Sequence, residues 1–167
     1  MPNFYLDTIC SDSRFHSTVA IRDPALLEPT FRTAILSLIV EAENAGVMLR
    51  MLETFRSEEL QQIYFARGVT QLQNVGVHHY GLACDLGIMI GGQVNWKADY
   101  SVLGKLGRKR SLVWGGDWGH PERPHSFRDY DHLQRVAVED QSRLFNGSWY
   151  PELEYRALPP SSGDGAN

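Results

Sequence analysis

Apolar residues recur at intervals of three and four between residues 29 and 46, and this period predicts a helix. Pro29 suits the first turn of that helix and Gly46 suits its end. The apolar positions are Phe31, Ala34, Ile35, Leu38, Ile39 and Ala42.

Strand and helix patterns alternate in the next part of the chain. Residues 47–55 alternate loosely and predict a strand, and Ser57 can cap a second helix that stops at Gly68. Residues 80–90 form a mostly apolar run. This run predicts a buried strand that ends at the turn signal Gly91-Gly92.

The remaining elements are short. Residues 93–96 can form the hairpin partner of that buried strand, and a helix is expected near 99–109. Further strands are expected over 111–114 and 132–138. The Gly-, Pro-, His- and charge-rich segment 115–128 predicts a loop that is long enough to suspect a function. Helices followed by clustered strands predict an α+β fold, a small antiparallel sheet flanked by helices.

The length and composition of the chain predict one domain. With 167 residues, the chain can bury a sizeable core without disulfides, and Cys10 and Cys84 need not pair. We place the domain at residues 1–158, because the composition of residues 159–167 is typical of a flexible tail.

Charge and hydropathy exclude several partners. A formal net charge of −4 argues against binding nucleic acid, and the short basic run 107–110 fits the end of a helix. The most apolar stretch, 34–40, is too short to cross a membrane. The N-terminus has no pattern of a secretory signal, so we expect a chain that is cytoplasmic when synthesised.

The stretch VHHYGLACDL, residues 77–86, carries the first candidate chemistry. Asp85 is a carboxylate inside an apolar run, which is costly without a charged or hydrogen-bonded partner. That partner could be an arginine, or a metal ion bound together with His78 or His79. Catalytic zinc takes three protein ligands from His, Asp and Glu and leaves a fourth position open.

A metal site of this kind needs a third, remote ligand. His16, His120, His125 and His132 are the candidates, and His132 stands out because Asp129 lies three residues before it. If this segment forms a helical turn, both side chains lie on the same side. A carboxylate beside a metal site can move a proton between water and a leaving amine. Each of these residues also has a purely structural interpretation, as a turn residue, a surface residue or a packed polar residue.

Taken together, five motifs resemble a family of zinc peptidases. The motifs are ETFRS (53–57), Gln61, GVHHYGLACDL (76–86), WGGDW (114–118) and DYDHLQ (129–134). The family includes phage L-alanyl-D-glutamate endopeptidases, D-Ala-D-Ala carboxypeptidases and D,D-dipeptidases of vancomycin resistance. The motifs occur in family order between residue 23 and about residue 138.

The resemblance implies a hedgehog/DD-peptidase-type fold and one zinc ion held by His78, Asp85 and His132. It implies Asp129 as the general base and acid, and Arg56 as the contact to the substrate carbonyl. The planar charged fork of an arginine suits an oxyanion that develops in the transition state. In that mechanism zinc activates a water and Asp129 takes its proton as the carbonyl is attacked.

Three further residues match positions near the family's active site. Gln61 and Tyr80 match positions beside the substrate cleft, although packing explains both almost as well. Asp117 could orient a ligand histidine, and it could equally cap the turn at Gly115-Gly116.

The resemblance also implies a substrate, the stem peptides of peptidoglycan. The WGGDW motif and an aspartate as the base look more like the phage endopeptidases, which cut the L-Ala–D-Glu bond. We therefore expect a monomeric endolysin-type enzyme that acts on the cell wall after release. The alternatives are a D-Ala-D-Ala dipeptidase or carboxypeptidase, and a non-catalytic, metal-stabilised binding module. Gly76 stands where the family usually has a serine, so the specificity can differ.

The choice between His78 and His79 depends on where the strand begins. Strand alternation places His79 on the face of Asp85, whereas the family spacing selects His78. We select His78, because the strand is expected to begin only near Gly81. Cys84 is then expected to point into the core, away from the metal.

Overall fold

The computed structural model of the protein describes residues 3–118 and 127–151. The described helices are α1 (Pro29–Asn44), α2 (Glu58–Ala66), α3 (Ser101–Arg108) and α4 (Gln141–Phe145). The described strands are β1 (Leu49–Glu53), β2 (Ala83–Ile90), β3 (Gln93–Val94), β4 (Val113–Trp114) and β5 (His132–Gln134). Short turns of 3-10 or π type include η1 (Tyr5–Ile9), η2 (Pro24–Leu26), η3 (Val77–Tyr80), η4 (Gly115–Asp117) and η5 (Val138–Asp140). Within these described ranges, no helix is both long enough and apolar enough to cross a membrane.

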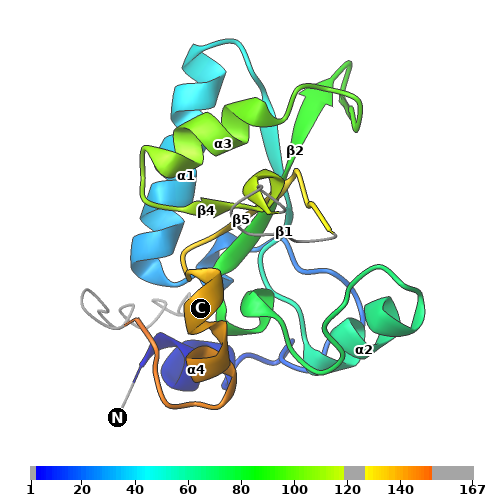
Figure 1. Ribbon diagram of the computed structural model, residues 1–167, viewed down its shortest axis with the longest axis vertical. Helices are drawn as coiled ribbons and strands as arrows, with labels where there is room; N and C mark the ends of the chain where they lie inside the picture. Colours follow the sequence, from blue (N-terminus) through cyan, green and yellow to red (C-terminus); the bar gives the residue numbers. More distant parts are fainter. Residues whose placement is uncertain (1–2, 119–126, 152–167) are drawn as a thin grey trace, which may run out of the picture.

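The strands form one antiparallel sheet in the order β1-β2-β5-β4, and β3 pairs with the far end of β2 as a hairpin. Figure 1 shows α1 and α3 together on one side of the molecule and α2 apart from them. The apolar faces of α1 and α3 pack on the sheet and form the main core. That core includes Phe31, Ile35, Leu38, Cys84, Leu86, Leu103 and Leu133.

The alternation of β2 and β5 separates the core from a polar face. Cys84 lies opposite Leu133 across the two strands, and both belong to the core beneath the helices. The next pair, Asp85 opposite His132, therefore points to the other face. Cross-strand neighbours have Cβ atoms about 4.5–5.5 Å apart. The sheet thus places a carboxylate beside a histidine on its polar face.

A β-bulge in β1 adds a third residue to this row. Met51 lies opposite Leu86, but Glu53 rather than Leu52 lies opposite Asp85. The extra residue reverses the alternation of β1 at this point, as bulges do. Glu53, Asp85 and His132 therefore follow one another across three neighbouring strands.

The segment before β2 is a 3-10 turn rather than a strand. The turn η3 carries His78 and His79 and ends at Gly81, whose φ is 68°. The strand β2 begins only at Ala83. Strand alternation consequently does not apply to the two histidines, as the sequence analysis expected.

Most of the predicted elements are present. The helix after Pro29, the Ser57 cap and the β2–β3 hairpin are confirmed, and the Ser57 hydroxyl accepts the Leu60 N–H at 3.0 Å. The strand expected over 132–138 ends at Gln134. The turn η5 and the helix α4 follow it, and neither was predicted. Part of the loop expected over 115–128 and the tail 159–167 lie outside the described residues. The predicted α+β fold with a small antiparallel sheet is confirmed.

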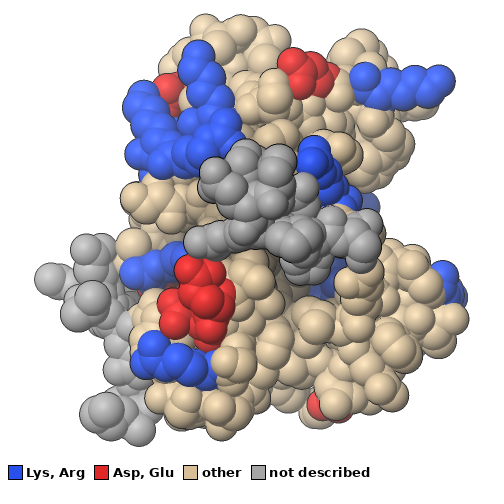
Figure 2. Space-filling view, viewed as in Figure 1, with Lys and Arg blue, Asp and Glu red and all other residues tan. Residues whose placement is uncertain are grey.

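The basic run near residue 108 ends α3, as expected. Figure 2 shows Lys and Arg side chains gathered at this end of the molecule. Arg108 pairs with Asp117 at 2.8 Å, and Lys109 and Arg110 pair with Glu41 at 2.8 and 2.7 Å. These cations therefore have carboxylate partners within the chain.

We expect Gly81→Ala to destabilise the protein more than Gly46→Ala. Both glycines have positive φ values, which cost a residue with a side chain about 1–2 kcal/mol. A Cβ at Gly46 meets nothing within 4 Å, whereas one at Gly81 would lie 2.5 Å from the Leu26 carbonyl oxygen and 2.7 Å from Ile9 Cδ1. Urea unfolding of both variants measures the difference. Equal losses of unfolding free energy would contradict the close packing at Gly81.

Candidate metal centre

Three potential ligand atoms meet on the polar face of the sheet. His78 Nε2 lies 3.1 Å from Asp85 Oδ1 and 3.2 Å from His132 Nδ1, and those last two atoms are 3.0 Å apart. We call these three residues the metal group. The side chains are 4%, 14% and 7% exposed, respectively. Among the described residues, this is the group of histidines and acids that could hold a metal ion.

The spacing of the metal group fits a tetrahedral zinc ion. Zinc bonds of 2.0–2.1 Å with tetrahedral angles place ligand atoms about 3.3 Å apart. The three observed distances form a nearly equilateral triangle of almost this size. Two imidazole nitrogens and a carboxylate oxygen are also a usual zinc donor set. The group can therefore hold a divalent metal and leave one coordination position open.

Gln134 orients His132 from behind. The Gln134 Nε2 donates to the Val136 carbonyl at 2.5 Å, so its Oε1 faces His132 Nε2 at 2.9 Å. An amide oxygen only accepts hydrogen bonds, which places the proton of His132 on Nε2. The lone pair of Nδ1 then points toward the metal group, as in many metal sites. Sequence reasoning missed this residue, although alternation places Gln134 on the same face as His132.

Charges within the metal group shift the pKa values of its members. Burial raises the pKa of Asp85, but His78 and His132 outweigh it and hold that pKa well below the ordinary value. Burial lowers the pKa of His132, but the hydrogen bond and charge of Asp85 outweigh it, so this pKa is raised. A proton therefore competes with a cation for the same atoms.

Arg56 lies beside the metal group and is held on three sides. Its Nε donates to Glu53 Oε1 at 2.5 Å and its Nη2 also pairs with that oxygen, while Nη1 donates to Gln61 Oε1 at 3.1 Å. Its Nη2 lies 3.8 Å from Asp85 Oδ2, and its guanidinium covers the Tyr64 ring at 4.8 Å. Both terminal nitrogens carry a second N–H. Arg56 can therefore donate to a substrate beside the metal group.

Gln61 and Tyr80 are buried, at 1% and 8% exposure. The Gln61 amide also donates to Thr70 Oγ1 and to the Leu72 carbonyl, so it supports Arg56. The Tyr80 ring packs on Tyr5 and other aromatic rings. Their contact with substrate stays a prediction.

Asp129 lies in the turn that leads into β5. The His132 N–H bonds to the Asp129 carbonyl at 3.4 Å, so one turn joins the two residues, although no helix forms there. A Cβ on Gly115 would collide with the Asp129 backbone, so this position needs a glycine. Burial and a hydrogen bond with Asp129 raise the pKa of Asp131 to about 9. The sequence position of Asp131 did not reveal this raised pKa.

The other candidates lie apart from the metal group. His79 contacts the Tyr5 hydroxyl at 2.9 Å and the Arg56 carbonyl at 3.2 Å, and burial lowers its pKa. The Asp117 carboxylate accepts two hydrogen bonds from Arg108. The contact to His132 that was considered for Asp117 is made by Gln134. His16 is exposed and pairs with Glu59.

Two further expectations concern Cys84 and the segment after Trp118. Cys84 is fully buried in the core, as expected. His120 and His125 lie outside the described residues.

Comparisons with known proteins agree with this fold. No protein-family model matches the chain. The chain is 28% identical over 157 residues to peptidoglycan L-alanyl-D-glutamate endopeptidase CwlK of Bacillus subtilis (strain 168). The aligned region covers 80% of this chain and 90% of CwlK.

Solved structures show the same fold. The L-Ala D-Glu endopeptidase ChiX of Serratia marcescens matches with a TM-score of 0.55 and 20% identity over 75% of this chain and 96% of that one. The LD-carboxypeptidase LdcB matches with a TM-score of 0.50 and 20% identity over 72% of this chain and 71% of that one. The fold is thus that of the DD-peptidase-like peptidases. Within this class the chain is similar to the L-alanyl-D-glutamate endopeptidases, and the resemblance inferred from the sequence is confirmed.

We expect the metal affinity of the protein to fall as the pH falls. The metal needs neutral His132, and Asp85 raises the pKa of this residue above its ordinary value of about 6.5. Protons therefore compete with the metal for His132 already above pH 6.5, and raising the pH further removes the proton from His132. Dissociation constants for zinc between pH 5.5 and 8 measure the effect. An affinity that is flat over this range would contradict His132 as a ligand.

Proposed function

We propose that this chain is a zinc metallopeptidase that hydrolyses the L-Ala–D-Glu bond of peptidoglycan stem peptides. The triangle of His78 Nε2, Asp85 Oδ1 and His132 Nδ1 carries the proposal, because it suits a catalytic metal with an open position. The similarity to CwlK and the fold shared with ChiX support the class of enzyme and of substrate. One zinc ion per chain, a monomeric state and action at the cell wall belong to the same proposal.

The chemistry divides between the metal and two side chains. Zinc held by the metal group would polarise the scissile carbonyl and lower the pKa of water toward ~7. Asp129 takes the proton of the attacking water and returns it to the departing amine. The Asp129 N–H donates to the Gly115 carbonyl at 3.1 Å, and this hydrogen bond helps to fix the Asp129 backbone.

Arg56 stabilises the negative charge that develops on the carbonyl oxygen. Glu53 and Gln61 each accept one of its hydrogen bonds, so the guanidinium is already oriented before substrate binds. Its position 3.8 Å from Asp85 places this positive charge at the edge of the metal group. An oriented donor of this kind needs no reorganisation during the reaction.

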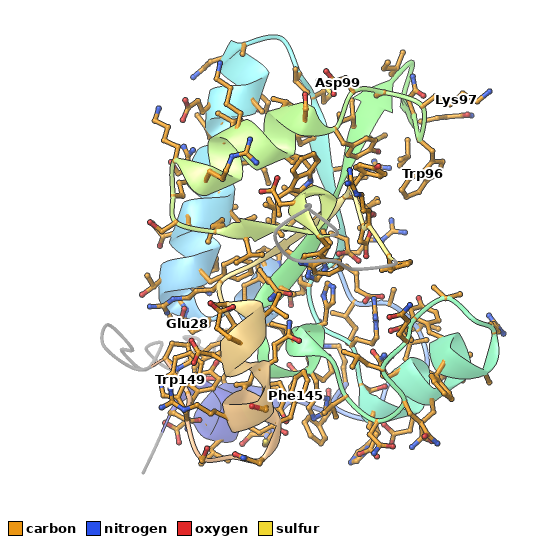
Figure 3. All side chains as sticks on the ribbon, in the orientation of Figure 1. Glu28, Trp96, Lys97, Asp99, Phe145 and Trp149 are labelled. Carbon is orange, nitrogen blue, oxygen red and sulfur yellow. The ribbon has the colours of Figure 1, made fainter. Side chains whose placement is uncertain are left out.

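A cavity beside Asp129 favours an endopeptidase over a D,D-dipeptidase. Its volume is about 480 Å³, and its walls include Trp96, Lys97, Arg128 and Tyr130. Figure 3 shows Trp96 and Lys97 on the segment between β3 and α3. We propose that the leaving group, whose amine receives a proton from Asp129, extends from Asp129 into this cavity, which Asp129 lines. Its volume is that of a small-molecule site, with room for a fragment longer than a single alanine.

The bond can be identified by digesting purified muropeptides with the zinc-loaded protein. Mass spectrometry should show new D-Glu amino termini. Released D-Ala or the dipeptide D-Ala-D-Ala would instead identify a D,D-peptidase. A protein that binds zinc and leaves all muropeptides intact would indicate a non-catalytic binding module.

We expect Asp129→Asn to lose activity while it keeps its metal. General acid–base catalysis contributes about 10²–10⁴-fold to the rate, and the amide cannot take a proton from water. Turnover of a defined muropeptide should fall by this factor, with zinc content unchanged. Asp117→Asn is the matched control, since its partner Arg108 lies on the surface. Full activity in the Asp129 variant would rule out the proposed base.

A further inference from the structure

Glu53 is a buried acid that the mechanism above does not use as a catalytic group. Its residue exposure is 4%, and it lies at the end of β1 opposite Asp85. A carboxylate removed from water in this way is costly unless charged or hydrogen-bonding partners surround it. Its position also depends on the β-bulge at Leu52, without which Glu53 would not face the metal group.

One oxygen of Glu53 faces both Arg56 and His78. The Oε1 atom accepts a hydrogen bond from Arg56 Nε and forms an ion pair with Arg56 Nη2, and it lies 3.9 Å from His78 Nδ1. The other oxygen, Oε2, accepts from the Tyr64 hydroxyl at 3.4 Å. This carboxylate therefore joins the proposed oxyanion donor to a proposed metal ligand.

The Nδ1 atom of His78 gives the second observation. It is buried and has no hydrogen-bond partner among the described residues. A neutral imidazole carries its proton on one nitrogen only. The negative charge of Glu53 favours that proton on Nδ1, which leaves the Nε2 lone pair facing Asp85 and His132.

The charge of Arg56 gives the third observation. Its Nη2 lies 3.8 Å from Asp85 Oδ2, and a bare guanidinium there would repel a bound cation and compete for the carboxylate. Glu53 neutralises this charge and draws the guanidinium toward β1. Both effects of Glu53 act in the same direction, toward tighter metal binding.

We propose that Glu53 is a positioning residue of the metal centre, which fixes the metal-facing nitrogen of His78 and balances the charge of Arg56. This inference rests on the proposed function for the identity of the metal and the role of Arg56. Glu53 itself touches neither metal nor substrate in this arrangement, and it acts through its two neighbours.

The test is the zinc affinity of Glu53→Gln in the full chain, measured by competition with a chromophoric chelator. Partners behind metal ligands typically contribute 10–100-fold to affinity, so we expect the dissociation constant to rise by about this factor. Cobalt(II) loaded in place of zinc gives a second readout, since a changed ligand field should alter its visible absorption spectrum. Glu53→Asp keeps the charge and should recover part of the affinity.

Glu28→Gln is the matched control for a general loss of stability. Glu28 is also fully buried and paired with an arginine, Arg135, at 2.7 Å. Figure 3 shows Glu28 near the start of α1, and its printed contacts are with the α1 N-terminus and Arg135. We expect Glu28→Gln to lower the unfolding temperature and to leave the zinc affinity unchanged.

Two results would overturn the inference: an unchanged zinc affinity in Glu53→Gln, or an equal loss in Glu28→Gln. If Glu53→Gln does not fold, Glu53→Asp gives the decisive measurement, since a shorter side chain lies farther from His78 and should weaken zinc binding less than tenfold but measurably. Zinc affinity is measured without peptidoglycan. A failed muropeptide digest would therefore refute the proposed function and leave the role of Glu53 standing.

Discussion

The pairing of Asp85 with His132 across β2 and β5 is the constraint on which the candidate site depends. These two strands place Cys84 and Leu133 under the helices, and the same register places the next two residues on the opposite face. Burial of the core thus fixes the register, and the register brings the ligand atoms together. A shift by one residue would bury the carboxylate under α1 and expose the cysteine.

Most of the charged side chains around Asp85 and His132 have a partner of opposite charge. Asp85 is stabilised as an anion by two histidines, and Arg56 is balanced by Glu53. Burial and the neighbouring Asp129 raise the pKa of Asp131, which favours its uncharged form beside Asp129. Pairing of this kind offsets part of the cost of removing these charges from water.

The local signals in the sequence were sufficient for most of the fold. The period of three and four, the Ser57 cap and the Gly91-Gly92 turn each define an element from neighbouring residues alone. The fold class and the peptidase resemblance could therefore be predicted. The short helix α4 lacks a long enough period to be recognised, and the end of β5 depends on the elements that follow it.

The environment of the site was harder to predict, because it depends on contacts between distant strands. His78, Asp85 and His132 lie in motifs, so their association could be expected from the sequence. The position of Glu53 could not be expected from the sequence, because a bulge reverses the regular alternation of side chains along β1. Gln134 follows the alternation of β5, but its role depends on the amide orientation that Val136 sets.

The bulge has a consequence for how this chain can vary in evolution. Residues added to the β2–β3 hairpin lengthen a surface feature and leave the polar row intact. If the bulge in β1 were straightened with all residues kept, Leu52 would lie opposite Asp85 and Glu53 would turn toward the apolar helices. Relatives that keep this acid are thus expected to differ in loop length far more freely than in the length of their first strand.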